Sequence, residues 1–206
     1  MKAVFLTRCY KSTNLPAIKK NLQEVFQGTK HTYAHVLVCD LRHGANENDF
    51  LPFFDEQTWG WFYDEKAPCQ TPYMTWAMDD IIGHCSSRIE PAYVYVLDDD
   101  NLIHPDFPSI LDMANGGDKA YVFHVDGHPE WGNPLERGES AVGKIDWANF
   151  ITRLDMMQKV QIYHIGDDSH NSDGLFFDRL VKAPCWPPGI SYVSAVLGYY
   201  NALPKP

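Results

Sequence analysis

The sequence predicts an α/β sandwich, a single domain in which a mostly parallel central sheet is flanked by helices. Short apolar runs alternate with stretches of helical spacing along the 206 residues, which is typical of α/β folds. The first 40 residues contain a strand–helix–strand unit, which implies parallel strands joined by a right-handed crossover. No linker-like stretch splits the chain, so one domain spanning residues 1–206 is expected.

The N-terminal unit consists of a strand, a helix and a second strand. Residues 3–7, AVFLT, form an apolar run typical of a buried strand. The helix that follows has Asn14 as its N-cap and Pro16 in its first turn, where the missing N–H of proline costs nothing. Residues 32–39, TYAHVLVC, predict the second strand, which ends at Asp40.

The middle of the chain combines a long irregular stretch with a buried strand. Residues 42–72 are rich in Gly, Asn, Pro and aromatics, and so long a stretch inside a domain is usually a functional loop. A helix is expected at 73–87, where Met and Ile recur on one face. The apolar run at 92–97 predicts a strand, and 107–115 predicts a short helix.

The last third of the chain continues the alternation. Residues 119–125 and 159–165 each predict a strand, and 172–182 predicts a helix that begins with a Ser or Asp cap. Residues 143–153 mix Gly with aromatics, which indicates a sheet edge or a loop. Residues 189–200 predict a strand or a helix, because their periodicity fits both.

Composition narrows the possible functions. Acidic side chains outnumber basic ones, 27 to 17, and the net charge is −10. Binding to nucleic acid relies on Lys and Arg, so no nucleic-acid partner is expected, whereas an acidic chain suits a bound cation. The five cysteines are odd in number and form no CxxC pair, which predicts a reduced, cytoplasmic protein. No apolar run reaches 18 residues and the N-terminus is no secretory signal, so no transmembrane segment is expected.

Three consecutive aspartates, Asp98, Asp99 and Asp100, follow the apolar run at 92–97. A tight turn there would aim alternate side chains, Asp98 and Asp100, at one spot outside the carboxyl end of a strand, where ligands of open α/β sheets bind. Two carboxylates at one spot need a shared proton or a cation, and oxygen ligands favour magnesium or manganese. The alternative is a solvated acidic turn. A calcium loop of the EF-hand type is excluded, because Ile103 takes the place of its glycine.

The apolar strand that ends in D-x-D, preceded by an N-terminal β-α-β unit, resembles metal-dependent, family-2-like glycosyltransferases of the GT-A fold. In that family the D-x-D motif holds a divalent cation against the diphosphate of a nucleotide sugar. The resemblance implies that Asp98 and Asp100 bind Mn²⁺ or Mg²⁺ and that Asp99 lies nearer the sugar or ribose. It also places nucleotide contacts at Thr7 and Arg8, although Arg8 fits a plain surface charge as well.

Further segments occur in the order expected of that family. Asp40 matches a carboxylate that reads the base, although it also fits a turn cap. Residues 170–174, HNSDG, resemble the segment that carries the catalytic base of inverting members, which implies that Asp173 is the base. Asp173 equally fits a helix N-cap, and Asp168 and Asp146 are reserve candidates.

The chain departs from the family in two respects. Many members carry a metal-binding His near the C-terminus, whereas the last His here is His170, and Ser172 stands where the family has Glu.

Several aromatic and histidine side chains are candidates for an acceptor or sugar pocket, because the C–H faces of sugars stack on aromatic rings. The candidates are Trp59, Trp61, Trp147, His124 and His170. Burial in a core is the alternative for each Trp, since large aromatics fill cores by default. The spaced pairs His31/His35 and His124/His128 do not predict zinc, because strand residues four apart lie roughly 13 Å apart.

The resemblance implies a metal-dependent, inverting glycosyltransferase that moves a hexosyl or deoxyhexosyl group from a nucleotide diphosphate sugar, a UDP-sugar by preference, to a hydroxyl acceptor. The nucleotide-binding half would span about 1–101 and the acceptor half about 102–206. One alternative is a nucleotidyltransferase on a related sheet, against which the absence of any glycine before Gly28 counts. The other is a non-catalytic nucleotide-sugar-binding module.

Overall fold

A computed structural model of the chain describes residues 2–63, 92–114, 117–127, 145–160, 172–184 and 189–205. The helix expected at 73–87 lies outside these residues. Within them, no helix is long and apolar enough to cross a membrane.

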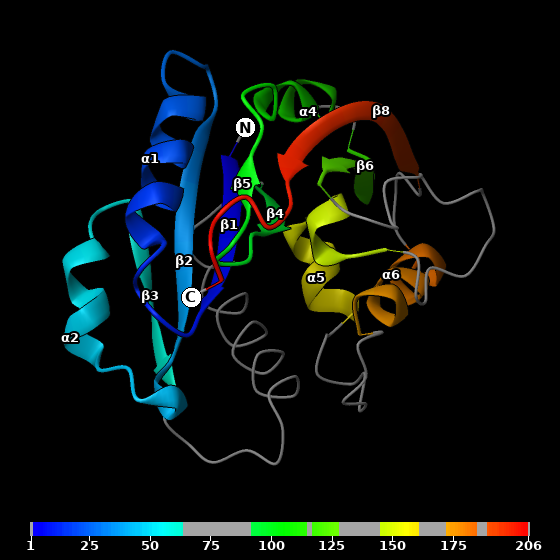
Figure 1. Cartoon of the computed structure of the whole chain (residues 1–206). Helices are drawn as coiled ribbons and strands as arrows, with labels where there is room; N and C mark the ends of the chain where they lie inside the picture. The colour runs from blue at the N-terminus through cyan, green and yellow to red at the C-terminus, as the bar shows by residue number, and fades with distance from the viewer. Residues whose placement is uncertain are drawn as a thin grey trace.

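The described residues form one eight-stranded sheet with the strand order β3-β2-β1-β4-β7-β6-β8-β5 (Figure 1). The strands are β1 (Lys2–Cys9), β2 (Thr32–Asp40), β3 (Thr58–Tyr63), β4 (Ala92–Val96), β5 (Leu102–Ile103), β6 (Ala120–Asp126), β7 (Phe150–Arg153) and β8 (Ile190–Tyr199). The helices are α1 (Leu15–Phe26), α2 (Glu47–Phe50), α4 (Pro108–Met113), α5 (Leu154–Val160) and α6 (Ser172–Lys182). Short 3-10 turns occur at η1 (Leu41–His43), η2 (Leu51–Phe53) and η4 (Trp147–Asn149).

The predicted α/β architecture is confirmed, and the sheet is mixed. β1 pairs in parallel with both β2 and β4, β2 with β3, and β6 with β8. β7 runs antiparallel to β4 and β6, and β5 runs antiparallel to β8. The parallel half, β3-β2-β1-β4, is therefore the part in which carboxyl ends meet at one edge.

The two faces of the sheet bury different helices, because side chains of a strand alternate between faces. In β1, Ala3 and Phe5 pack with α1 and α4, whereas Val4 and Leu6 pack with α5 and α6. In Figure 1, α5 and α6 accordingly lie together and away from α1. The same alternation decides on which face of the sheet each side chain at the end of a strand lies.

Three sequence predictions needed correction. The stretch 42–72 is not one irregular loop, because it contains β3 at the sheet edge; a Cβ on Gly60 would lie 2.1 Å from the carbonyl oxygen of Leu37, so only glycine fits that close approach. β7 is no edge or loop, since it pairs on both sides. The start of the strand expected at 159–165 is helical, because Val160 ends α5, and the rest lies outside the described residues.

Candidate functional site

The ends of β1 and β4 bring Arg8 and Asp98 together. Leu6 pairs with Val96 in the register of these strands, and two residues further on Arg8 and Asp98 emerge on the same face. The Nε and Nη2 atoms of Arg8 donate to the two carboxylate oxygens of Asp98, each at 2.6 Å. Burial disfavours the charge of Arg8, but the Asp98 carboxylate outweighs this and raises the pKa of the guanidinium. Arg8 therefore offsets much of the repulsion within the aspartate triplet.

Asp99 points away from Asp98 and is buried, with 7% of its surface exposed. The backbone N–H of Tyr10 donates to its carboxylate at 3.4 Å. Burial raises the pKa of Asp99 to about 6, more than the Tyr10 bond lowers it. The Asp99 side chain thus links the aspartate turn to Tyr10, just after the end of β1.

The raised pKa of Asp99 makes the protein less stable as the pH rises. A carboxyl whose folded pKa exceeds its unfolded value stabilises the fold at low pH, and this contribution is lost as the pH rises through about 6. We expect Asp99→Asn to raise the free energy of unfolding at pH 8 by about 2 kcal/mol and to have little effect at pH 4. Denaturant unfolding at both pH values measures this change in the free energy of unfolding, and Asp106→Asn, at an exposed position, is the control. Equal effects at both pH values would contradict the prediction.

Asp100 is partly exposed, and its pKa is raised by burial and by the charge of Asp98. The backbone N–H of Leu203 donates to its carbonyl oxygen at 2.9 Å, which fixes the turn but leaves the carboxylate available. Asp100 is therefore the member of the triplet best placed to bind a cation.

Asp146 and Asp173 extend the acidic site from the other half of the sheet. Asp146 caps η4, where its Oδ1 accepts from Ala148 N at 2.8 Å, and its pKa is raised by burial and by Asp98. Asp173 lies in the first turn of α6 and accepts from Gly174 N at 2.9 Å. Burial, followed by the charge of Asp146, raises the pKa of Asp173 to about 7.

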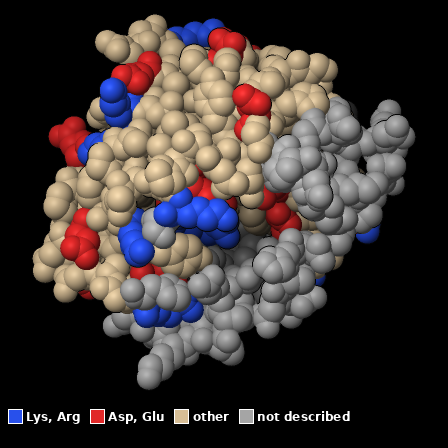
Figure 2. All heavy atoms as spheres, in the orientation of Figure 1, with Lys and Arg blue, Asp and Glu red and all other residues tan. Residues whose placement is uncertain are grey.

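We call Arg8, Asp98, Asp100, Asp146 and Asp173 the aspartate site. Charges on its members act on one another from β1, β4, η4 and α6, whose residues are far apart in the sequence. Figure 2 shows acidic and basic side chains gathered around a hollow of the surface. Asp146 was expected only as a weaker reserve candidate for the base, behind Asp168.

The carboxylates of the aspartate site suit a hard divalent cation in part. Carboxylate oxygens are the ligands that magnesium and manganese prefer, and a cation would relieve the repulsion that raises the pKa of Asp100. Both carboxylate oxygens of Asp98, however, accept from Arg8. Among the described residues, no group of three or more His, Cys, Asp or Glu side chains is arranged to hold a metal. The Asp100 carboxylate can therefore bind a divalent cation as it stands, whereas the Asp98 carboxylate can bind one only when Arg8 releases it.

Two further predicted nucleotide contacts have partners inside the protein. Thr7 is fully buried on the face opposite to Arg8, and its hydroxyl lies 2.9 Å from Nε2 of His35. The Asp40 carboxylate accepts from the backbone N–H and the guanidinium of Arg42 and caps η1. The turn-cap alternative for Asp40 is thus observed, and the hydroxyl of the buried Thr7 already has a partner inside the protein.

The aromatic and histidine candidates lie mostly in or against the core. Trp147 is buried, and its ring centroid lies 4.9 Å from that of Phe176. Trp59 and Trp61 of β3 are partly buried and pack against the same core cluster. His124, on β6, is partly exposed. His170 and Asp168 lie outside the described residues.

The histidines that were excluded as zinc ligands have other partners. Nε2 of His31 lies 3.1 Å from the Asp112 carboxylate, and His35 bonds Thr7.

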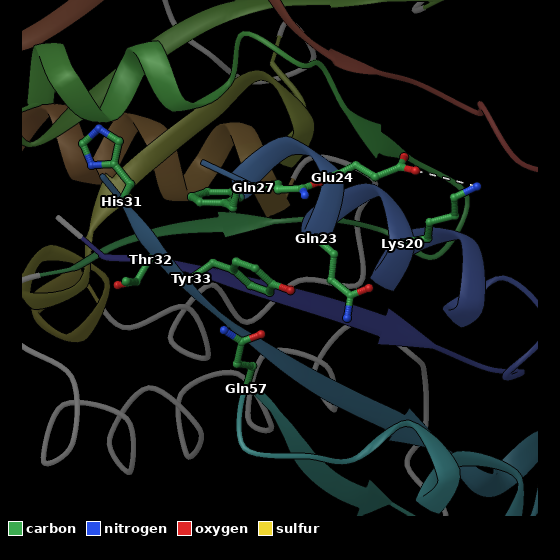
Figure 3. A pocket seen from close by; sticks show the side chains of 9 residues that line it. Lys20, Gln23, Glu24, Gln27, His31, Thr32, Tyr33 and Gln57 are labelled. Atoms are coloured by element: carbon green, nitrogen blue, oxygen red, sulfur yellow. Dashed lines mark ion pairs between the residues drawn. The ribbon is translucent and has the colours of Figure 1, made fainter. Parts of the chain in front are cut away.

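A groove of about 500 Å³ lies elsewhere on the molecule, beside the start of β2 and the end of α1 (Figure 3). Gln23, Tyr33 and Gln57 line it with six other residues, and Lys20 pairs with Glu24 across its rim. It lies at the amino ends of the parallel strands, whereas ligands of such sheets bind beyond the carboxyl ends. The aspartate site therefore remains the candidate functional site.

No family profile and no curated protein sequence match this chain. Solved structures do resemble it. Residues 1–349 of S. aureus TarS have a TM-score of 0.65 at 14% identity, covering 97% of this chain and 60% of that 1–349 chain, and the same TarS residues in complex with UDP-GlcNAc give the same TM-score. The galactosyltransferase LgtC, in complex with donor and acceptor sugar analogues, has a TM-score of 0.55 at 11% identity, covering 94% of this chain and 73% of LgtC.

A third neighbour is 4-diphosphocytidyl-2C-methyl-D-erythritol synthase, with a TM-score of 0.54 at 9% identity, covering 94% of this chain and 88% of the synthase. TarS and LgtC are glycosyltransferases of the GT-A fold, so these likenesses show that the chain has a GT-A-like fold. The chain spans about 60% of the length of the TarS structure that it matches.

Proposed function

We propose that this chain is a glycosyltransferase that moves a hexosyl or deoxyhexosyl group from a nucleotide diphosphate sugar, a UDP-sugar by preference, to a hydroxyl acceptor with inversion. The observation that carries the proposal is the aspartate site itself, in which Asp173, in the first turn of α6, interacts electrostatically with Asp146 and Arg8, and burial raises its pKa to about 7. A general base works best when its pKa lies near the operating pH, so a carboxyl with a raised pKa suits this role better than one with an ordinary pKa. The complex of TarS with UDP-GlcNAc supports the choice of donor.

Most side chains of the aspartate site have a role in this proposal. Asp173 would take the proton of the incoming hydroxyl, while Asp98 holds Arg8 in place at the end of β1. Asp100 would hold Mn²⁺ or Mg²⁺, which supplies positive charge to the departing diphosphate. Asp99 would contribute by fixing the turn that presents Asp98 and Asp100.

Metal dependence is tested by donor turnover in the presence and absence of Mn²⁺. We expect added Mn²⁺ to stimulate turnover of a UDP-sugar and Asp100→Ala to reduce the stimulated rate by roughly 100-fold, since a metal contributes several kcal/mol to such a transition state. Exposed Asp106→Ala is the matched control, since it removes an acidic side chain six residues downstream. Turnover that needs no metal and survives Asp100→Ala would show that the cation has no part in the reaction.

A nucleotidyltransferase is the second candidate, favoured by one observation. The likeness in fold to 4-diphosphocytidyl-2C-methyl-D-erythritol synthase, with a TM-score of 0.54, favours it. Release of pyrophosphate from a nucleoside triphosphate would establish this activity. Binding of intact nucleotide sugars without hydrolysis or transfer, across a broad acceptor panel, would instead indicate a binding module.

A further inference from the structure

The segment after β8, residues 200–205, lies against the aspartate turn. The backbone N–H of Asn201 donates to Oδ1 of Asn101 at 2.9 Å, and that of Leu203 donates to the carbonyl of Asp100 at 2.9 Å. Asn201 adopts a left-handed conformation, with φ of 48°, which turns the chain toward the triplet. The last described residues are thus attached to the turn that carries the candidate cation ligand.

Asn14 joins three parts of the structure at this point. Its side-chain Nδ2 donates to the carbonyl of Asp99 at 2.8 Å and to the carbonyl of Pro204 at 2.7 Å. Asn14 is 6% exposed and makes no capping bond with its side chain, although it occupies the N-cap position of α1. A buried amide used in this way fixes the position of Pro204 relative to the turn.

The next residue, Lys205, is exposed and adds a positive charge beside Asp100. Figure 1 marks the C-terminus next to the carboxyl ends of β1 and β2, the edge at which the aspartate site lies.

The charges of the aspartate site indicate a role for Lys205. Asp98, Asp100, Asp146 and Asp173 would repel a diphosphate, and the charge of Arg8 is already paired with Asp98. An ammonium on a long, flexible stem reaches phosphate oxygens easily and can leave a carboxylate for them. A diphosphate approaching Asp100 would therefore meet Lys205.

We propose that residues 200–205 form one wall of the donor site and that Lys205 binds the diphosphate group of the donor, with Asn14 as the residue that positions it. The inference rests on the proposed function, because it assigns the donor's diphosphate to the aspartate site. It adds a binding residue that no motif in the sequence indicated.

Binding of uridine, UMP and UDP to the full chain tests the inference. We expect Lys205→Gln to weaken binding of UDP about tenfold, which is the size of a bond to a charged group, and to leave uridine binding unchanged. Lys205→Arg should retain most of the affinity. Exposed Lys20→Gln, on α1, is the matched control and should bind all three compounds as the wild type does.

Asn14→Ala separates positioning from general stability. If Asn14 acts by placing Lys205, it should weaken UDP binding but not uridine binding, and Asn14→Ala combined with Lys205→Gln should bind UDP no more weakly than Lys205→Gln alone. Equal loss of uridine and UDP affinity in Asn14→Ala would contradict the positioning role. Wild-type affinity for UDP in Lys205→Gln would overturn the inference and leave the proposed function intact. A wild-type chain that binds neither UDP nor a UDP-sugar would overturn both.

Discussion

Asp173→Asn should reduce sugar transfer by about 10²- to 10⁴-fold while leaving donor binding almost unchanged. General base catalysis contributes this range, and asparagine keeps the shape of the side chain but cannot accept the proton. Asp173 lies on α6, whereas the triplet follows β4, so the donor side of the site keeps its contacts. Rates under saturating donor, together with calorimetric donor binding, measure the two effects separately.

The pH dependence identifies the base more sharply than the loss of rate does. Burial, and then Asp146, raises the pKa of Asp173 to about 7. The base must be ionised, so the wild-type rate should rise with pH up to about 7 and level off above it. The residual rate of Asp173→Asn should lack this rise, whereas Asp178→Asn, a control on the same helix, should keep it.

A different outcome would point to the neighbouring carboxyl. If Asp173→Asn keeps both the rate and its rise with pH, the base is not Asp173. Asp146 is then the candidate to test, since its pKa is also raised by burial and by Asp98. Asp146→Asn would then have to remove the rise with pH.

The parallel half of the fold could be predicted from local patterns. The apolar runs of β1, β2 and β4 are buried on both faces, so each appears in the sequence as an almost uninterrupted apolar stretch. The position of the aspartates followed directly, because a run that ends in charged residues marks the end of a buried strand. Asp98 and Asp99 were also correctly expected to point in different directions.

The rest of the site depends on long-range pairing, which no local pattern contains. β7 is four residues long and lies between β4 and β6 in the sheet. The residues just before it, among them Trp147 and Asn149, have a sequence pattern typical of a loop. The pairing of Arg8 with Asp98 joins residues 90 positions apart. The aspartate pattern therefore predicted a shared proton or a cation at the triplet, and nothing local in it pointed to Arg8 as the partner.

Arg8→Met should lower the free energy of unfolding by about 2 kcal/mol, which corresponds to a fall in Tm of roughly 4–8 °C for a chain of this size. The side chains of Arg8 and Asp98 are 28% and 22% exposed, so water screens the pair little. Removing Arg8 leaves Asp98 without its bidentate partner, next to Asp100 and Asp146, and the repulsion among these carboxylates is then unopposed.

A second substitution distinguishes this repulsion from lost packing. Arg8→Met combined with Asp98→Asn removes the charge that Arg8 balances, so it should recover most of the lost stability, whereas lost packing of the arginine stem would not recover. Lys20→Met breaks the exposed pair with Glu24 and should have a much smaller effect, because solvent already screens that pair.

Adding Mn²⁺ to Arg8→Met supplies the missing positive charge by another route. If Asp98 and Asp100 can share a cation once Arg8 is gone, Mn²⁺ should raise the Tm of Arg8→Met more than that of the wild type. An equal shift in both proteins would mean that the guanidinium and the metal do not compete for Asp98.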